Sequence, residues 1–504
     1  MARPVERVAV VGRDAALWLT ALGLRRAFGA AGVQIEAVEL PTQVRGVDVY
    51  AALPSLESLH RALKLEHNDV LAGAGGVTSL GQRFVNWSKG GGSFIHAYDS
   101  IGASVNNVDF IQFWMKARSE GMRVPLQAFS IGATAAEQGR YIGPGDVSSS
   151  FSRAASGCNL DAQAYIALLR RAAVKAGVVV TSGQVTSVAR DGERITSIRL
   201  GSGVQVEADL FVDASGVDAV LMKGAPGDAF ESSRETFGAD RLLAVTAPRL
   251  NPLPSFNQIT AFRGGWIGQY PLQNRTAILV AYNPQVFPEK DLFMALAQVT
   301  GLKPDANAFG SPIAPGVRAK PWIGNCVAVG DAAGVIEPLD ANGLHLTHVG
   351  LSHLISHFPV DADDMGEAPG FNRAFAAHAG NMRDYVQAHY RLNRRFDEPF
   401  WDYVRERPVS ANLAWKLEMF GARGRVPMFD DEAFEADDWI SLFVGHGMTA
   451  EAWDPLVDSL TRDEQIEHFQ KMLAYIAGEV GQMPSLEAHL EFNMPSNGGG
   501  GGLL

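Results

Sequence analysis

The spacing of apolar residues predicts a βαβ unit at the start of the chain. Residues 8–11 form an uninterrupted apolar run that ends at Gly12, which is typical of a strand buried on both faces. Apolar residues then recur at helical spacing over 17–28, and a second strand is expected over 35–40 with Glu39 near its end. A unit of this size is typical of dinucleotide-binding folds.

The rest of the chain alternates between strand and helix patterns before it becomes mostly helical. Strands and helices that interleave early and helices that dominate late predict an α/β protein with a helical carboxy-terminal part. The expected segments are glycine-rich loop over 40–150, a helix over 161–177, a strand over 178–181, a β-meander over 185–210, strands over 240–290, helices beyond 370 and a disordered tail at 498–502.

Length, charge and cysteine content narrow the function classes. At 504 residues the chain is equivalent to roughly three average domains, or to one large enzyme core. The formal charge of −12 gives no general attraction to nucleic acid or to anionic lipid, so neither is an expected partner. Cys158 and Cys326 lack metal-ligand spacing, so no metal site is expected. Two charges, Arg13 and Asp14, divide the first apolar stretch, so we expect no membrane span or signal peptide and a cytoplasmic location.

The turn after the first strand keeps one glycine of the dinucleotide-binding pattern. G-x-G-x-x-G uses its glycines for a tight turn, for close approach of the pyrophosphate and for packing of helix on strand. Gly12 supplies the first, but Asp14 stands at the second position and Leu17 at the third. Asp14 therefore brings a side chain and a negative charge toward the pyrophosphate path. Taken alone, the motif favours a structural βαβ unit.

Two further strand ends strengthen the prediction of a dinucleotide site. Residues 209–216 and 325–331 are apolar strands that end in small residues and, in the second case, in an acid. An acid at a strand end beside a helix amino terminus can accept hydrogen bonds from sugar hydroxyls while the helix end faces phosphate. The candidate cofactor-binding residues are Gly12, Glu39, Ser215, Gly216, Gly330 and Asp331.

Several longer motifs resemble those of the flavin-dependent tryptophan halogenase family over nearly the whole chain. They are F-V-N-W at 84–87, S-F-I-H at 93–96, E-P-L at 337–339, and the segments 385–401, 439–447 and 454–458. The resemblance implies an FAD-binding Rossmann-like core of the glutathione-reductase and hydroxybenzoate-hydroxylase type, a β-sheet substrate region and a helical cap. The implied boundaries are a core over 1–370 with the substrate region interleaved at about 60–150 and 225–310, a cap over 371–495 and a disordered tail over 496–504.

The resemblance also implies a reaction and its partners. In the family, a separate flavin reductase supplies reduced FAD, oxygen and halide then give hypohalous acid, and a lysine delivers the halogen to an aromatic substrate. The expected cofactor is therefore FAD, with chloride or bromide as halide. The expected partners are a flavin reductase and a small aromatic molecule, with a homodimer as one assembly.

The family's catalytic positions are only partly kept. Ser79 stands at the lysine position, where a hydroxyl provides neither the charge nor the amine. Asp340 stands at the glutamate position, and the backbone amides of Asn342 and Gly343 match the family's halide site. In the tunnel motif, which keeps Trp266 and Pro271, Gly268 replaces the second tryptophan, and this loss predicts a wider channel between flavin and substrate.

Aromatic residues at the family's substrate positions are better kept. His96 matches the family's histidine and Tyr98 its phenylalanine, and Trp439 or Phe434 would contribute from the cap. Flat aromatic walls would stack on an indole or phenol ring and orient it. Without the resemblance, core packing beneath a loop would be the favoured explanation of His96 and Tyr98.

Three functional hypotheses remain open from the sequence. The first is an FAD-dependent oxidoreductase of the halogenase type acting on an aromatic compound. The second is a related monooxygenase, in which oxygen reaches the substrate directly because the lysine and the second tryptophan are missing. The third is a non-catalytic relative that has lost FAD and binds a ligand or a protein partner. Four residues count for the third hypothesis, namely Asp14, Leu17, Ser79 and Gly268. The first two hypotheses are supported by Glu39, Ser215, Asp331, the turn over 340–343 and His96.

Overall fold

One half of the fold is built on a six-stranded sheet. The computed structural model describes residues 2–141 and 155–493. Strand order is β20-β21-β12-β1-β2-β8, parallel throughout except at the edge pair β20–β21. The strands are β1 (Arg7–Gly12), β2 (Gln34–Glu39), β8 (Val179–Ser182), β12 (Leu210–Ala214), β20 (Trp322–Ile323) and β21 (Cys326–Ala328). The predicted first βαβ unit is confirmed.

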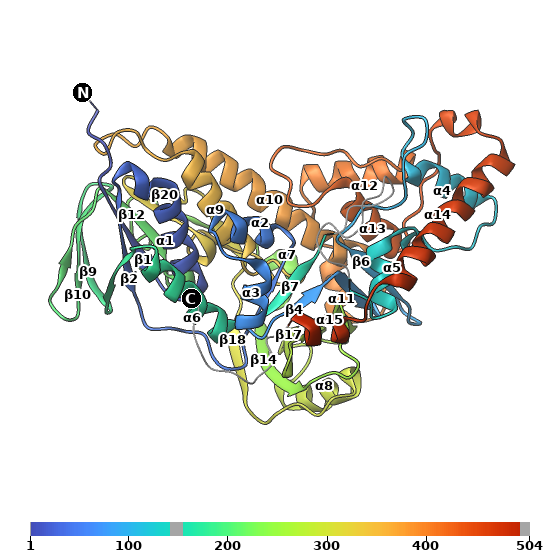
Figure 1. Ribbon diagram of the computed structural model, residues 1–504, viewed down its shortest axis with the longest axis horizontal. Coiled ribbons are helices and arrows are strands. Elements are labelled where there is room, and N and C mark those ends of the chain that lie inside the picture. Colours follow the sequence, from blue (N-terminus) through green and yellow to red (C-terminus); the bar gives the residue numbers. More distant parts are fainter. Residues whose placement is uncertain (1, 142–154, 494–504) are drawn as a thin grey trace.

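Helices cover this sheet and bury their apolar faces against it. The helix α1 (Asp14–Phe28) follows β1 and packs between α6 (Ala162–Lys175) and α9 (His345–Ser356). Its Leu17 and Trp18 are fully buried. Figure 1 shows α1 and α6 on one side of the strands. Asp161 caps α6 by accepting a hydrogen bond from the Ala164 amide, so the predicted helix over 161–177 is confirmed with tighter ends.

A seven-stranded sheet forms the second half, in the order β18-β14-β17-β16-β15-β5-β6. Neighbouring strands are antiparallel except β15 and β5. The expected strands over 240–290 are therefore confirmed, and they lie at the centre of this sheet. The bounds are β5 (Gly81–Val85), β6 (Ser93–Ala97), β14 (Arg241–Pro248), β15 (Asn257–Phe262), β16 (Gly265–Pro271), β17 (Arg275–Tyr282) and β18 (Ala308–Pro312).

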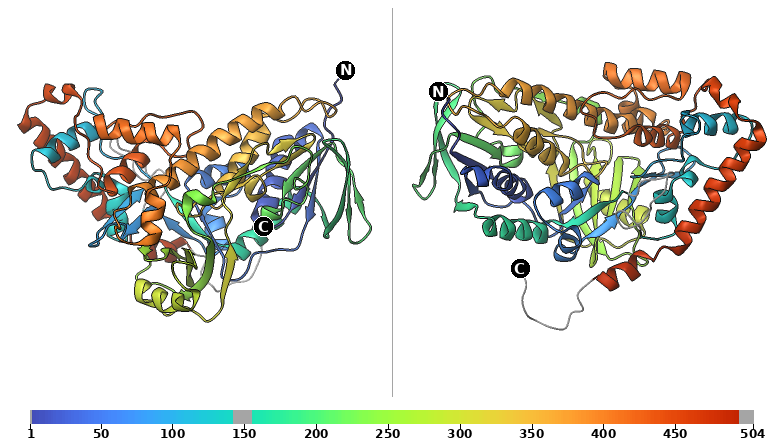
Figure 2. Two further views of the ribbon diagram at one scale, coloured as in Figure 1. Left: turned by 180° about the vertical axis from the view of Figure 1, so that it is seen from behind. Right: turned by 45° about the horizontal axis from the view of Figure 1, so that its top comes forward.

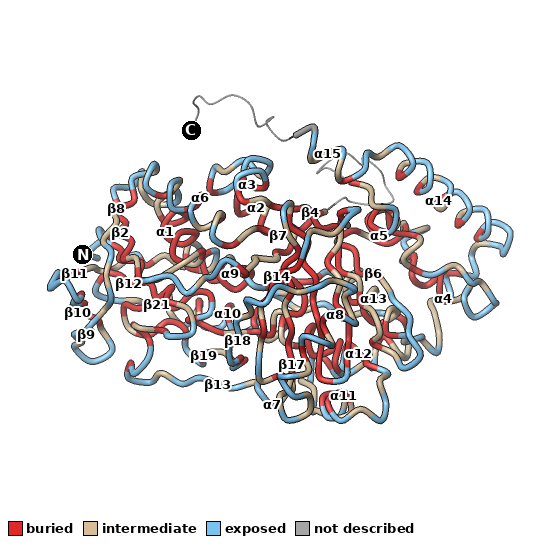
Figure 3. The backbone as a smooth tube through the Cα atoms, turned by 90° about the horizontal axis from the view of Figure 1, so that it is seen from below, coloured by how far each residue is buried: buried red, intermediate tan, exposed pale blue. Residues whose placement is uncertain are grey.

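Three small sheets connect and flank the large ones. The order β3-β7-β4 joins β3 (Val49–Ala52), β7 (Gly157–Asp161) and β4 (Val77–Ser79). The predicted meander is the sheet of β9 (Val185–Asp191), β10 (Arg194–Leu200) and β11 (Gln205–Val206), whose outer residues are exposed in Figure 3. The third sheet pairs β13 (Phe230–Ser232), β19 (Gly316–Arg318) and β22 (Gly334–Val335).

The carboxy-terminal part is helical, as expected. Its helices are α10 (Ala368–Leu392), α11 (Pro399–Arg405), α12 (Ala411–Arg423), α13 (Ala436–Gly445), α14 (Arg462–Gln482) and α15 (Leu486–Asn493). Figures 1 and 2 show α10 passing from the six-stranded sheet to the other carboxy-terminal helices. The core of this part also contains Phe110, Trp114 and Phe129 from the first third of the chain, packed with Phe443 and Phe469. The cap is thus built from two distant segments.

The segment 40–141 is loop-rich, as expected, but it also contains regular elements that the sequence did not indicate. Within 40–141 the structure places four strands, β3 to β6, and the helices α2 (Ser55–Ala62), α3 (His67–Gly73), α4 (Phe110–Ser119) and α5 (Ile131–Glu137). Polar residues such as Gln82 and His96 are fully buried on these strands, and this hid their periodicity. The predicted tail at 498–502 lies outside the described residues.

Two further findings concern membranes and metals. Within 2–141 and 155–493, no helix is long and apolar enough to cross a bilayer. The same residues contain no group of three or more histidine, cysteine, aspartate or glutamate side chains placed to hold a metal ion. Cys158 and Cys326 are both buried free thiols.

Candidate active site

A cavity of about 800 Å³ lies between the two large sheets. It opens where β1 and β12 end and α1 begins, which is where open α/β sheets bind their ligands. Strands β14, β17 and β18 supply one wall, and residues 335–344 close the far end. The predicted site residues that line it are Gly216, Asp331 and Gly343.

The turn after β1 places Asp14 at the cavity wall, where its carboxylate already has hydrogen-bond partners. Asp14 has a φ of 58°, a left-handed conformation that glycine adopts more readily. Its carboxylate accepts hydrogen bonds from the Thr42 hydroxyl and, at 3.2 Å, from the Gln43 amide. Arg13 forms an ion pair with Asp218 at 2.5 Å beside it. Gly12 lies beneath the turn, where a Cβ would be 2.3 Å from the Ala214 carbonyl oxygen.

Two predicted cofactor residues have protein partners of their own. Glu39, at the end of β2, accepts from Arg170 at 3.1 Å and from the Ser182 hydroxyl at 3.2 Å, and it does not line the cavity. Ser215 is fully buried; its hydroxyl donates to Asp213 at 2.5 Å and accepts from the Val220 amide at 2.8 Å. The structure therefore places Ser215 inside the turn and Gly216 on the cavity wall.

The second strand end faces the same cavity. Gly330 has a φ of 59°, and a Cβ there would lie 2.5 Å from the Thr347 hydroxyl oxygen, so only glycine fits. This turn leaves the Asp331 side chain exposed at the cavity wall. Asp331 is thus free to accept hydrogen bonds from a bound ligand.

The turn over 337–343 carries Asp340 and closes the cavity. Asn342 forms a bridge to Ala52 at the edge of β3 and donates from Nδ2 to the Glu337 carbonyl at 3.0 Å. Gly343 lines the cavity, whereas Asp340 is fully buried behind it. The predicted carboxylate and halide positions therefore lie in one turn at the cavity, with Gly343 at its wall and Asp340 behind it.

Asp340 is a buried carboxylate without hydrogen-bond donors. His389 Nε2 lies 3.3 Å from Asp340 Oδ2, but neither carboxylate oxygen accepts a hydrogen bond within the described residues. The other nitrogen of His389 lies 2.9 Å from His446 Nε2. Burial, followed by repulsion from His389, lowers the pKa of His446. A buried acceptor with unmet hydrogen-bonding capacity is costly in a finished core and is common where a ligand binds.

Aromatic side chains surround Asp340. Burial, and then the negative charge of Asp340, raise the pKa values of Tyr98, Tyr270 and Tyr385. All three hydroxyls are therefore protonated donors at neutral pH. The Tyr98 hydroxyl interacts with the Gln82 side chain, and neither group has a further hydrogen-bond partner among the described residues. These two polar groups and Asp340 form the polar part of the candidate substrate region.

The predicted substrate residues meet around Tyr385 of α10. The Phe434 ring stacks on Tyr385 with centroids 3.6 Å apart, and the Trp439 ring meets it edge-on at 4.9 Å. The Tyr385 hydroxyl lies 3.3 Å from His96 Nδ1. Burial is the largest single effect and lowers the pKa of His96, but the 2.8 Å hydrogen bond to Asp438 and the negative charges of Asp438, Asp340 and Asp99 together outweigh it, so the net pKa is raised. His96 is therefore held by the cap.

Ser79 does not point its hydroxyl at Asp340. It is buried on β4, and its hydroxyl donates to the Gly81 carbonyl at 2.9 Å. In the small sheet, Ser79 of β4 pairs with Gly157 of β7, and β7 pairs in turn with β3. The next neighbour of β3 is Asn342, which forms a bridge to it. Ser79 and the halide turn are therefore three strand spacings apart, or roughly 14 Å.

The predicted tunnel residues Trp266 and Pro271 lie on β16, where Trp266 anchors a second buried acid. Trp266 Nε1 donates to Glu337 Oε1 at 2.7 Å and to the Tyr390 hydroxyl oxygen at 2.9 Å. Tyr390 donates to the same Glu337 oxygen. Burial raises the pKa of Glu337 to about 7. The Pro271 carbonyl accepts from Asn159 at 3.2 Å. Neither Trp266 nor Pro271 lines the 800 Å³ cavity.

Gly268 does not widen the channel, contrary to the sequence-based expectation. Residues i and i+2 of a strand share a face, and the Tyr270 ring folds back over Gly268. A Cβ at Gly268 would lie 2.7 Å from Tyr270 Cε2 and 2.8 Å from its hydroxyl oxygen. Tyr270 thus occupies space that the missing tryptophan would need, and it brings a phenol into the field of Asp340.

This arrangement predicts a compensating pair of substitutions. Gly268→Trp alone forces two rings into one space and is expected to lower the free energy of unfolding by about 2 kcal/mol. Adding Tyr270→Ile, which restores the family pattern, should recover most of that loss in urea unfolding. Gly310→Ala on β18 is the control, because a Cβ there meets no atom nearer than 3.9 Å. Equal stability of the single and double variants would contradict the packing described.

Comparison with known proteins identifies the family. The profile described as Tryptophan halogenase matches residues 7–462. The chain belongs to the tryptophan halogenase family. Among curated relatives, tryptophan 7-halogenase KtzQ of Kutzneria sp. (strain 744) is 25% identical over 526 aligned residues, covering 96% of this chain and 98% of KtzQ.

Solved structures similar to this tryptophan halogenase family member are flavin-dependent halogenases. BrvH from Brevundimonas sp. BAL3 superposes with a TM-score of 0.91 at 29% identity, covering 97% of this chain and 99% of BrvH. Xcc4156 from Xanthomonas campestris gives 0.92 at 26% identity, covering 99% and 100%. The predicted α/β fold with an FAD-binding Rossmann-like core and a helical carboxy-terminal part is therefore confirmed.

Sequence reasoning gave no role to several residues of the site in this family member. His389 and Tyr390 lie inside the 385–401 motif, but their contacts with Asp340 and Glu337 join distant segments. Tyr270 lies in the tunnel motif. Only its position two residues after Gly268 could have indicated that its ring fills the space of the missing tryptophan. Gln82 carries no sequence signal beyond a polar residue on an apolar strand.

Proposed function

We propose that the protein is an FAD-dependent oxidoreductase that acts on a small aromatic molecule with an indole- or phenol-like ring. The observation that carries this proposal is one continuous cavity that runs from the α1 amino terminus, past Asp331, to the turn that holds the buried Asp340. The proposed electron donor is reduced FAD from a separate flavin reductase. Two buried free thiols fit a reducing cytoplasm, where we place the reaction, and a homodimer is the proposed assembly.

The residues that line the cavity fit FAD. The amino terminus of α1 would face the pyrophosphate, since helix amino termini attract anions. Asp14 is compatible with this because Thr42 and Gln43 already satisfy its carboxylate. Asp331 would accept from ribitol hydroxyls, and Gly216 leaves open space beside the chain of the cofactor. Bound in reduced form, FAD supplies the electrons that reduce oxygen.

Asp340 would take the proton that the aromatic ring loses. In electrophilic substitution, a ring carbon gains oxygen or halogen and releases H⁺, which needs a nearby base. Asp340 is suited to this role because its two oxygens lack donors and face the aromatic cluster. His389, 3.3 Å away, would orient the carboxylate. His96, Tyr98 and Trp439 would hold the ring and keep water from it.

The proposal also includes a halide site. Backbone amides of Asn342 and Gly343 would hold chloride or bromide at the end of the cavity, since backbone donors do not depend on side-chain identity. The family's lysine, which delivers the halogen, is replaced here by Ser79. The Ser79 hydroxyl cannot take over that role, because it already donates to the Gly81 carbonyl. This observation favours a second candidate activity, a flavin monooxygenase that transfers oxygen to the same aromatic substrate.

Product analysis with and without bromide tests these proposals. The protein is supplied with FAD, a flavin reductase, NADH and a panel of indoles and phenols, and oxygen uptake and product mass are measured. Substrate-dependent oxygen uptake with an oxygenated product is expected for the natural protein. Ser79→Lys is expected to divert part of the product to the brominated form. A brominated product from the natural protein would refute the monooxygenase, and no product with any substrate would contradict both activities.

A further inference from the structure

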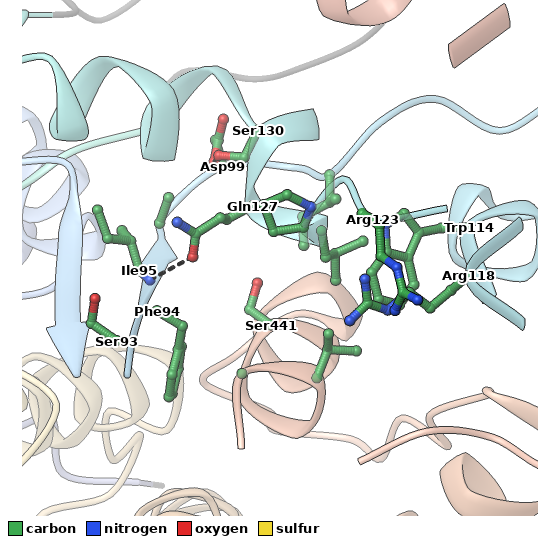
Figure 4. A pocket seen from close by; sticks show the side chains of 16 residues that line it. Ser93, Phe94, Ile95, Asp99, Trp114, Arg118, Arg123, Gln127, Ser130 and Ser441 are labelled. Carbon is green, nitrogen blue, oxygen red and sulfur yellow. Dashed lines mark hydrogen bonds between the residues drawn. The ribbon is translucent and has the colours of Figure 1, made fainter. Parts of the chain in front are cut away.

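A separate, smaller cavity of about 240 Å³ lies beyond β6 from Asp340. Side chains alternate along a strand, so Ile95 and Ala97 face this cavity whereas His96 faces the Asp340 cluster. The cavity is closed by the 3₁₀ helix η2 (Leu126–Phe129) and by α13 (Figure 4). Ile95, Ala97, Leu126 and Val444 supply the apolar parts of its walls, between polar side chains.

Two arginines give one end of this cavity a strong positive charge. Arg118, from the last turn of α4, and Arg123, from the following loop, lie side by side next to Trp114 in Figure 4. Arg118 lies over the Trp114 ring, 5.9 Å from its centroid, and donates to the Met122 carbonyl at 3.2 Å. Within the described residues, neither guanidinium forms an ion pair with a carboxylate. Both side chains are exposed, so water solvates their charges, and both guanidinium groups remain available to bind an anion.

Two hydroxyl groups also line the cavity. Ser441 points into it from α13, and Ser93 lies at the start of β6. Neither hydroxyl has a side-chain hydrogen bond within the described residues. At the far end, Asp99 accepts from the Ser130 hydroxyl at 2.6 Å and from the Gly132 amide at 2.8 Å, so the only carboxylate of the lining is already satisfied.

We infer that this cavity binds a small aromatic carboxylate. The carboxylate would lie on Arg118 and Arg123, whose planar guanidinium groups suit bidentate binding. The ring would lie between the apolar walls and beside Trp114. The volume is below the usual range for drug-sized ligands, so it suits one ring with a short acid side chain. This site lies outside the flavin cavity, and its occupation does not require the proposed reaction.

Calorimetric titration of the full chain with 3-phenylpropionate tests the inference, with the neutral 3-phenylpropionamide as matched probe. The acid should bind at least about tenfold more tightly than the amide, because charge-assisted hydrogen bonds contribute about 1.5–3 kcal/mol. Replacing both arginines (Arg118→Gln, Arg123→Gln) should remove that preference. Arg263→Gln, at the exposed turn between β15 and β16, is the control and should retain it.

A filling variant places the bound acid. Ser441→Phe puts a ring into the cavity and should abolish binding, with the melting temperature checked to exclude unfolding. Equal binding of acid and amide, unchanged binding by the double arginine variant, or no binding of millimolar acid would each overturn the inference. Persistent binding by Ser441→Phe would place the acid elsewhere, for example against the Asp340 cluster, and would also overturn it.

Discussion

Asp340→Asn is expected to lower kcat by at least about 100-fold while FAD still binds. Asparagine keeps the size of the side chain but cannot accept the ring proton, and positioned bases typically contribute factors of 10² to 10⁴. Asp340 is fully buried, and the His389 ring lies 3.3 Å from its carboxylate, so solvent buffer cannot easily replace it. The measurement is steady-state product formation with reduced FAD, together with flavin affinity from fluorescence quenching.

Two further variants show whether the effect is that of a base. Asp340→Glu restores the family's residue and should keep measurable turnover. His389→Gln should shift the pH profile of kcat, because His389 would act through Asp340, and should leave FAD affinity unchanged. If Asp340→Asn kept full activity, the proton acceptor would lie elsewhere in the site.

His378→Gln is expected to reduce the loss of stability that acid causes. His378 of α10 lies with its Nε2 2.8 Å from His345 Nε2 of α9, and the two rings stack. Burial, followed by repulsion from His353 and His348, lowers the pKa of His378 from 6.5 to about 4. The folded protein therefore keeps this ring neutral, whereas the unfolded chain takes up a proton below about pH 6.5.

The sign of the effect follows from proton uptake. Between pH 6.5 and 4 the unfolded state binds more protons, so the free energy of unfolding falls as pH falls. For this one residue the loss is about 2 kcal/mol at pH 5, and it is absent above pH 7.5. Urea unfolding of both proteins from pH 7.5 to 5 gives the difference curve, which should change by that amount. Gln387→Asn on the same helix is the control, because neither residue titrates. If the difference curve stayed flat from pH 7.5 to 5, the His378 ring of the folded natural protein would be protonated in this range, contrary to the prediction.

The nucleotide-binding half was predictable from the sequence because its signals are local. The apolar run before Gly12 and the helical spacing after it led to β1, α1 and β2 with errors of one to three residues. Parallel buried strands leave such runs because both faces meet helices. The strands over 77–97 were missed because buried polar residues, among them Gln82 and His96, look like loop or surface residues in a sequence.

The site was predictable only as far as motifs reached. Ser79, Asp340 and the aromatic residues were found by position, but their contacts were not, since these join β4, the 337–343 turn and α10. Gly268 shows the limit most clearly. The lost tryptophan suggested open space, and the structure fills that space with Tyr270 from the same strand face. A single substitution therefore cannot be interpreted without its neighbours in space.

Equilibrium binding of FAD is the most direct test of the central claim that the cavity between the two sheets holds a flavin. Protein incubated with FAD and desalted should keep a flavin absorbance band. Ala244→Trp, which places a ring in the cavity wall, should lose the band, whereas Ala189→Trp on the exposed strand β9 should keep it. A colourless natural protein that does not quench flavin fluorescence would contradict the account and would leave a ligand-binding relative of the family.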